Sequence, residues 1–192
     1  IEIDLPNVVQ SQVNEKINFD FSAGLRALLR HDPDVILVGE IRDAETADTA
    51  VRAALTGHLV ISTIHANTPV GAIMRLINLG VQQSLLADAL LGVYSQRLIR
   101  IYCNECAQSS IDSPAHLSEL PQLFNGCPSC FNSGFKGRVP LMDQLIINDG
   151  NKKQLLNNLS ELTHEKSMAL EAKELHDKGK TPLFELIRIM GL

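Results

Sequence analysis

The four cysteines of the chain form two pairs whose spacing is typical of a metal site. Cys103 and Cys106 enclose two residues, Cys127 and Cys130 enclose two more, and 20 residues separate the pairs. Four thiolates at this spacing can hold one zinc ion in a tetrahedral site. Because four protein ligands leave no position for water, we expect a structural zinc that folds the segment around it.

Other states of these cysteines are local CxxC disulfides or free thiols. Disulfides are rare in a reducing cytosol, which favours zinc. His116 lies between the pairs and could replace a thiolate, although four cysteines make a surface position the simpler interpretation.

Two further polar residues, Glu40 and His65, each follow a short apolar run. Residues 35–38 precede Gly39-Glu40, and residues 58–63 precede Ile64-His65. Apolar runs separated by a helix are typical of a buried parallel sheet, in which ligands bind beyond the carboxyl ends of the strands. A glutamate there can hold Mg²⁺ through water or orient an attacking water, and a histidine can contact a terminal phosphate.

Structural roles for the same residues have to be weighed. Glu40 could cap the next helix or pair with Arg42, but Asp43 is better placed to supply the cap. A single histidine at a strand end is more often a structural hydrogen bonder, and His58, at the opposite end of the second run, is expected to be one.

A nucleotide hydrolase also needs a phosphate-binding loop, so the motif GxxxxGK[ST] is relevant. The nearest match is Gly179-Lys180-Thr181, but Glu174 stands where the first glycine is required, and a helical segment precedes it. The sequence therefore contains no Walker A motif.

The elements that must position these residues follow from apolar spacing and helix-capping residues. We expect a short strand, a turn and a second extended segment over residues 1–13. Helices are expected from Ser22, as N-cap, to before Pro33, from Asp43 to Gly57, from Thr68-Pro69 to Gly80, and over 84–100, 152–159, 163–178 and 182–190. The alanines of the second helix predict a close approach to the sheet.

The composition divides the chain into three segments. Residues 1–101 alternate strands and helices, residues 102–141 are rich in Cys, Pro, Ser, Asn and Gly, and residues 142–192 are helical. The prediction is an α/β core, a loop-dominated zinc-binding insert and a helical C-terminal region.

Composition and charge exclude several classes of protein. The chain has 17 basic and 22 acidic residues, with a net charge of −5, and no basic run exceeds two residues, so nucleic-acid binding is not expected. No apolar stretch approaches the roughly 20 residues of a membrane span, and no signal peptide opens the chain. We expect a cytosolic protein, and Ile1 in place of Met suggests an N-terminal truncation.

Two segments resemble the Walker B and His-box regions of the ATPases that power type II secretion and type IV pilus assembly: GLRALLRHDPDVILVGEIRDAET and AALTGHLVISTIHANTPVGAIMRLINLGV. The resemblance continues through LLGVYSQRLIRIYC, both CxxC pairs and GFKGRVPLMDQL, and covers about residues 1–145. The four cysteines are similar to those of the secretion and pilus-extension branch, since pilus-retraction relatives lack them.

The resemblance implies a partial RecA-like P-loop ATPase core from a homo-hexameric motor, bound peripherally to the cytoplasmic face of the inner membrane. ATP hydrolysis with Mg²⁺ would drive rotation of a membrane platform protein, and a membrane anchor protein would be a second partner. By motif position, Glu40 matches the Walker B glutamate, His65 the His-box histidine, and Glu2 the last acid of the acidic box. Glu40 and Glu2 are thus catalytic candidates, and His65 is a nucleotide-binding one.

This sequence departs from the family pattern by lacking the Walker A loop, most of the acidic box and the N-terminal domain that supplies arginines to a neighbour's nucleotide. Catalysis by this chain alone is therefore not expected. A non-catalytic assembly module is the alternative, and a zinc-ribbon nucleic-acid binder is a weaker one, because only Lys136 and Arg138 supply positive charge near the cysteines.

Overall fold

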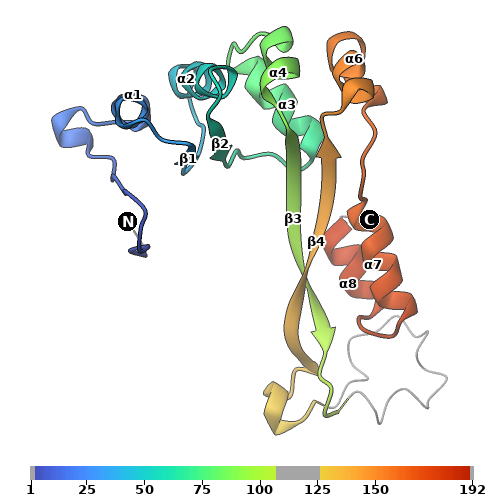
Figure 1. The fold of residues 1–192 in the computed structure, drawn as a ribbon. Helices are drawn as coiled ribbons and strands as arrows, with labels where there is room; N and C mark the ends of the chain where they lie inside the picture. The colour runs from blue at the N-terminus through green and yellow to red at the C-terminus, as the bar shows by residue number, and fades with distance from the viewer. Residues whose placement is uncertain (1–2, 107–125, 191–192) are drawn as a thin grey trace. The chain divides into compact units, whose positions relative to one another are not determined.

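The computed structural model of the chain describes residues 3–106 and 126–190 (Figure 1). Its contacts divide it into two compact units. Unit 1 comprises Ile1–Val93 and Ile146–Thr163, and unit 2 comprises Tyr94–Leu145 and His164–Leu192.

The described elements alternate between helix and strand in the first half of the chain. In order they are η1 (Glu15–Ile17), α1 (Phe21–Leu28), η2 (Leu29–His31), β1 (Val35–Val38), α2 (Ala44–Leu55), β2 (Leu59–Ser62), α3 (Pro69–Asn78), α4 (Gln83–Ala89), β3 (Gly92–Tyr102), η5 (Pro128–Cys130), β4 (Phe135–Ile146), α6 (Asp149–Asn157), η6 (Leu159–Glu161), α7 (Met168–Asp177) and α8 (Leu183–Met190). Here η denotes a 3₁₀ helix.

Unit 1 is built on a parallel pair of strands. β1 and β2 pair in register, with Val35 opposite Leu59 and Val38 opposite Ser62, so the predicted parallel pairing is confirmed. α2 connects the two strands, beginning at Asp43, whose carboxylate accepts a hydrogen bond from the Thr46 amide at 2.8 Å. Both strands therefore end at the same edge of the pair.

The predicted ends of the helices are mostly confirmed. Thr68 caps α3 by accepting from the Gly71 amide at 3.0 Å, and Gly57 follows α2 with a φ of +105°, a conformation that favours glycine. The N-cap of α1 is Asp20 and not Ser22, because the Asp20 carboxylate accepts from the Ala23 amide at 2.8 Å. Ser22 instead lies buried within α1.

The β1 and β2 pair is buried on one face only, which corrects the expectation of a sheet buried on both faces. Ile36 and Val38 are buried, and Ala47, Ala50 and Ala53 of α2 are among the most buried residues of the core, as expected for close approach to the sheet. The alternate side chains point away from α1 and α2 and are exposed, with 54% for Val35, 66% for Leu37, 43% for Leu59 and 49% for Ile61. Strand side chains alternate between faces, and the described residues cover only one.

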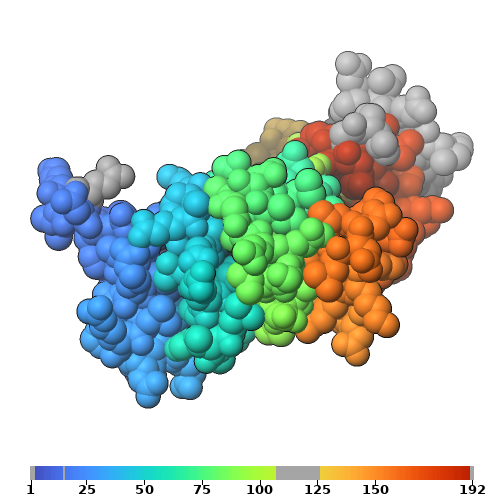
Figure 2. Space-filling view, turned by 90° about the horizontal axis from the view of Figure 1, so that it is seen from above, coloured from blue at the N-terminus to red at the C-terminus, as the bar shows by residue number. Residues whose placement is uncertain are grey.

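The end of unit 1 brings two distant segments together. α6 packs beside α4, with the Gln83 side-chain amide donating to the Leu155 carbonyl, and Figure 2 shows the orange surface of α6 adjoining the green surface of α4. Asn151, fully buried, donates to the carbonyls of Ile146 and Thr163. The Gln83 bond thus ties the returning segment to α4, and the bonds of Asn151 hold that segment itself together.

Three expectations about secondary structure were wrong. The helix predicted over 84–100 ends at Ala89, and residues 92–102 form β3, paired with β4 in the opposite direction (Figure 1). β4 starts at Phe135, inside the segment expected to be loop-dominated, and residues 3–13 contain no strand. Pairing with a strand more than thirty residues away supplies backbone partners to β3 that local spacing does not reveal.

Unit 2 packs its two C-terminal helices against the β3 and β4 ribbon. Its core consists of buried side chains from both strands and both helices: Ile99, Leu141, Met168, Ala172 and Ile189. The helical segments predicted at the end of the chain are present as α6, α7 and α8. Within the described residues, no helix combines the length and apolar character needed to cross a membrane.

Candidate functional site

Glu40 and His65 meet at the carboxyl edge of the β1 and β2 pair. His65 Nε2 lies 3.2 Å from Glu40 Oε2. The two segments remain hydrogen-bonded to each other beyond the ends of β1 and β2. The Ile41 amide donates to the Thr63 carbonyl at 2.9 Å, and the Thr63 hydroxyl donates to the Gly39 carbonyl at 2.7 Å. These bonds hold the two post-strand segments side by side and bring the two side chains together.

The charge of Glu40 is set by its neighbours. Arg42 Nη2 lies 2.5 Å from Glu40 Oε1, and hydrogen bonding to Arg42 is the largest cause that lowers the pKa of the Glu40 carboxyl. Partial burial acts in the opposite direction, and the His65 ring lowers the pKa further. Glu40 is therefore an ionised carboxylate at neutral pH, with an exposed histidine ring beside it.

The pairing of Glu40 with Arg42 is the structural alternative considered from the sequence, and it is present. It does not consume the whole carboxylate, because Arg42 contacts Oε1 and His65 contacts Oε2. His58, expected to be structural, bonds through Nδ1 with the Ala53 carbonyl at 3.0 Å near the end of α2.

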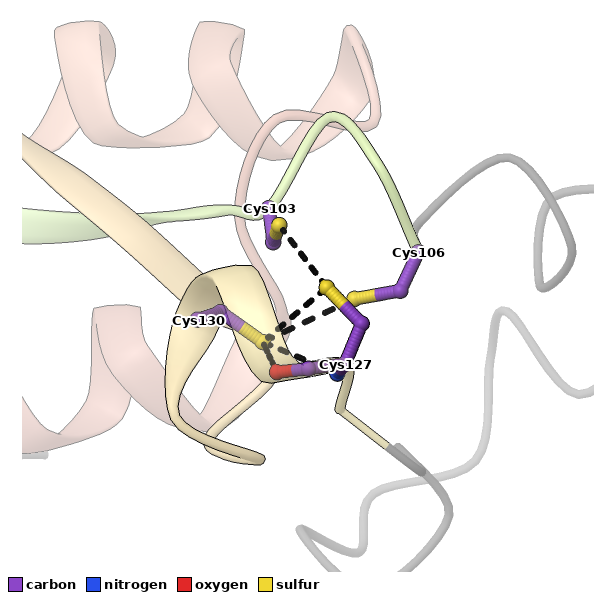
Figure 3. A group of neighbouring side chains, drawn as sticks. All are labelled: Cys103, Cys106, Cys127 and Cys130. Carbon is purple, nitrogen blue, oxygen red and sulfur yellow. Dashed lines mark hydrogen bonds between the residues drawn. The ribbon is translucent and has the colours of Figure 1, made fainter.

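The four cysteines converge on one point in unit 2 (Figure 3). Cys103 and Cys106 lie on the loop after β3, Cys127 and Cys130 lie at the ends of η5, and all four sulfur atoms lie within 4.8 Å of one another. The pairs Cys103 and Cys127, Cys106 and Cys130, and Cys127 and Cys130 are each separated by 3.8 Å between sulfurs. This distance is far longer than a disulfide bond of about 2.05 Å, so the disulfide alternative is not what the structure shows.

The cluster fits a tetrahedral metal ion. Four sulfurs bound at about 2.3 Å define a tetrahedron whose edges are about 3.8 Å. The three sulfur pairs named above have this separation, and all sulfurs lie within 4.8 Å of one another. Burial raises the pKa of Cys106 to about 12, with help from the neighbouring thiols. Burial would also raise the pKa of Cys130, but hydrogen bonds from the backbone amides of Cys127 and Gly134 outweigh burial and lower this pKa to about 6. The four thiols cannot all ionise together unless a cation compensates their charge.

A polar cluster joins the two cysteine loops on the outside. Glu105 lies inside the first CxxC pair and Ser129 inside the second, and the Ser129 hydroxyl donates to Glu105 Oε1 at 2.5 Å. Lys136 Nζ donates to the same carboxylate oxygen at 2.9 Å and to the Ser129 hydroxyl at 2.5 Å. This arrangement was not predicted from the sequence, although the two polar residues enclosed by the cysteine pairs were a signal for it.

The other candidates from the sequence have different outcomes. Glu2 and His116 lie outside the described residues. Gly179 and Thr181 follow α7, with Thr181 buried and donating its hydroxyl to the Arg100 carbonyl at 2.8 Å. That segment ends a helix and is not a phosphate-binding loop, as predicted.

Comparison with known proteins was made on sequence and on structure. Residues 1–188 match the family described as Type II/IV secretion system protein. Type II secretion system protein E of Pectobacterium carotovorum subsp. carotovorum is 47% identical over 156 residues, which cover 78% of this chain and 31% of that protein. Type II secretion system ATPase E of Vibrio cholerae serotype O1 is 38% identical over 205 residues, which cover 98% of this chain and 41% of that protein.

Among solved structures, that of the pilus retraction motor PilT with bound ADP is similar, with a TM-score of 0.62 and 29% identity, covering 88% of this chain and 43% of that one. The Legionella pneumophila ATPase DotB has a TM-score of 0.62 at 20% identity, which is evidence for the fold alone. The predicted mixed α/β fold is thus confirmed as part of a larger ATPase fold. The chain spans less than half the length of each of these relatives.

Proposed function

The chain belongs to the type II/IV secretion system protein family, and from that membership we propose that it forms the Walker B and zinc-binding part of a hexameric motor. The intact protein would hydrolyse ATP to drive type II secretion or type IV pilus assembly. The observation that carries this proposal is the meeting of Glu40 and His65 beyond two parallel strands, where α/β proteins bind ligands.

The two side chains would have different tasks in the intact enzyme. Glu40, held ionised by Arg42, would hold Mg²⁺ or orient the attacking water, and Mg²⁺ when bound would neutralise charge on the phosphate oxygens. His65, whose ring is largely exposed, would contact the terminal phosphate. Glu2 is proposed as a further catalytic acid on motif position.

The exposed face of the β1 and β2 pair supports a larger domain. Four apolar side chains, those of Val35, Leu37, Leu59 and Ile61, are each at least 43% exposed on adjacent strands. A sheet of an α/β domain normally buries both faces. We propose that further chain of the RecA-like core covers this face in the intact protein.

The cysteine cluster would bind zinc in a structural role. The four sulfurs already satisfy a tetrahedral site, so no position is left for water or substrate. The proposed division of the chain is a RecA-like part over 1–101, a zinc-binding insert over 102–141 and a helical region over 142–192. The proposed location is the cytoplasmic face of the inner membrane, beside the platform and anchor proteins of the machinery.

The test is Glu40→Gln in the full-length protein that contains this segment. We expect ATP hydrolysis to fall by at least 100-fold, because the amide cannot hold Mg²⁺ or accept a proton from water. Asp48→Asn is the matched control, since Asp48 is exposed on α2, bonds only with Arg52 among the described residues, and should leave the rate unchanged. Retained hydrolysis in Glu40→Gln would refute the assignment.

A non-catalytic assembly module is the second candidate, favoured by the lack of a Walker A motif in the sequence. Titration of this chain with ATP tests the second candidate: a chain without a phosphate-binding loop should show no measurable affinity, and measurable ATP binding would argue against a non-catalytic module. A nucleic-acid-binding role is the weakest candidate, and salt-dependent DNA binding would be its evidence.

A further inference from the structure

Unit 2 carries an arginine pocket that the proposed ATP and zinc sites do not use. The pocket has a volume of about 390 Å³ and is lined by Leu98 and Arg100 of β3, Arg138 of β4 and Arg188 of α8. All four residues belong to unit 2, so the pocket is formed within a single unit. We call it the arginine pocket.

Two arginines of the pocket, Arg100 and Arg188, form ion pairs with Glu185, whose side chain is fully buried. Arg100 Nε donates to Glu185 Oε1 at 3.0 Å, and Arg188 donates to Glu185 through Nε at 3.0 Å and through Nη2 at 2.9 Å. The Arg100 guanidinium also lies 4.5 Å above the centre of the Phe135 ring. Both guanidinium groups are therefore fixed before any ligand arrives, which reduces the entropy lost on binding.

The arginine pocket has unused donors and an excess of positive charge. The bonds to Glu185 use Nε and Nη2 of Arg100 and Arg188, and leave Nη1 of each without a partner among the described residues. Arg138 is exposed, and its side chain forms no ion pair or hydrogen bond within the described part of the chain. Three guanidinium groups thus line the pocket, and only two of them contact the single carboxylate of Glu185.

We propose that the arginine pocket binds an acidic segment of a partner protein, with carboxylate side chains on the guanidinium groups and an apolar side chain on Leu98. Guanidinium groups bind carboxylates through paired hydrogen bonds. Leu98 is 47% exposed at the wall of the pocket, and the volume falls in the range of sites for ligands larger than a single ion.

The charge of the rest of the chain favours a local acidic ligand over a phosphate-rich surface. The net charge is −5, so an extended anionic surface such as a membrane or nucleic acid would meet a net negative charge outside the pocket. An acidic peptide needs only the arginine pocket itself. This inference does not depend on the proposed ATPase activity.

The experiment measures binding of a fluorescein-labelled peptide with the sequence Leu-Glu-Leu-Glu-Glu-Leu to the whole chain, by fluorescence anisotropy at low salt. The same peptide with Gln in place of Glu is the control ligand. We expect the acidic peptide alone to bind, with affinity that falls as salt increases. Arg138→Gln should weaken binding about tenfold, because this side chain has no other partner whose loss would disturb the fold.

Lys173→Gln is the matched control variant, because it removes the same charge from an exposed position on α7. It should change the affinity by less than twofold. Equal losses in the two variants would overturn the proposal, because the binding would then depend on overall charge. The absence of binding to the acidic peptide would overturn it as well.

Two further measurements test other occupants. If inorganic phosphate or phosphatidylglycerol vesicles bind in an Arg138-dependent way and the peptide does not, the pocket is a phosphate site and the proposal is wrong. If sedimentation shows self-association that Arg138→Gln abolishes, the occupant is a second copy of this chain and not a partner protein, and the proposal is wrong.

Discussion

Replacing Glu185 with Gln tests how strongly one buried carboxylate stabilises unit 2. The glutamine keeps the shape of the side chain but removes its charge, and leaves Arg100 and Arg188 without their counter-ion. Breaking a buried pair in this way is strongly destabilising, because charged partners remain without compensation.

The magnitude follows from the pKa of Glu185. Burial alone would raise this pKa, but hydrogen bonds from Arg188 and Arg100 outweigh burial and lower it from 4.5 to about 2. A difference of about 2.5 corresponds to about 3 kcal/mol of folding free energy at roughly 1.36 kcal/mol per pKa unit. The side chains of Arg100 and Arg188 are 38% and 52% exposed, so solvent screens part of their interaction with Glu185. We therefore expect Glu185→Gln to lower the free energy of unfolding by about 2–3 kcal/mol at pH 7.

The pH dependence has a definite sign. The folded pKa lies below the unfolded one, so the stabilisation is complete above pH 4.5 and is lost as the pH falls toward 2. The stability difference between wild type and Glu185→Gln should therefore shrink to less than half between pH 7 and about pH 3. The two proteins must be compared at each pH because acid also weakens the binding of a metal ion by cysteine ligands, in wild type and variant alike.

The assay is urea denaturation followed by tyrosine fluorescence. The chain has no tryptophan, and its two tyrosines, Tyr94 and Tyr102, both belong to unit 2. Glu174→Gln is the matched control, since Glu174 pairs with Lys178 on the exposed side of α7 and should cost less than about 0.5 kcal/mol. A Glu185→Gln variant within 0.5 kcal/mol of wild type at pH 7, or a difference that does not change with pH, would refute the reasoning.

Two other predictions concern the metal site and a turn. Cys103→Ser should reduce the zinc content measured by metal analysis from one ion per chain to none and unfold the cysteine loops, because zinc needs all four thiolates. Wild-type protein that is purified without zinc would argue against the site. Gly57→Ala should lower the unfolding free energy by about 1–2 kcal/mol in thermal denaturation, because φ is +105° there and no neighbouring atom is crowded, and an unchanged melting temperature would contradict this.

Much of the local structure was predictable because its causes are close in the sequence. Asp43 and Thr68 cap their helices through amides three residues ahead, and Gly57 ends α2 because of its own backbone freedom. The CxxC pairs likewise place two sulfurs within reach of one ion by local geometry alone. Such features need no knowledge of the rest of the fold.

The errors arose where the determining partner is distant. Leu85 to Leu98 have apolar spacing that suits a helix, but residues 92–102 become a strand because β4 supplies their backbone partners. The short apolar run of β1 suggests burial on both faces, yet α1 and α2 cover only one. Burial and strand pairing are properties of the assembled chain, which explains why local spacing mispredicted both.

The sequence by itself determined the two strands and their order, the caps of the helices, the cysteine pairs and the resemblance to secretion ATPases. Each of these depends on residue types at short fixed spacings. Only the tertiary structure decided that Glu40 meets His65, that Lys136 joins the two cysteine loops, and that Glu185 holds two arginines at a pocket. The contacts of Glu40 with His65, of Glu105 with Lys136 and of Glu185 with Arg100 join residues 25 to 85 positions apart, and only packing of the folded chain can bring them within hydrogen-bond distance.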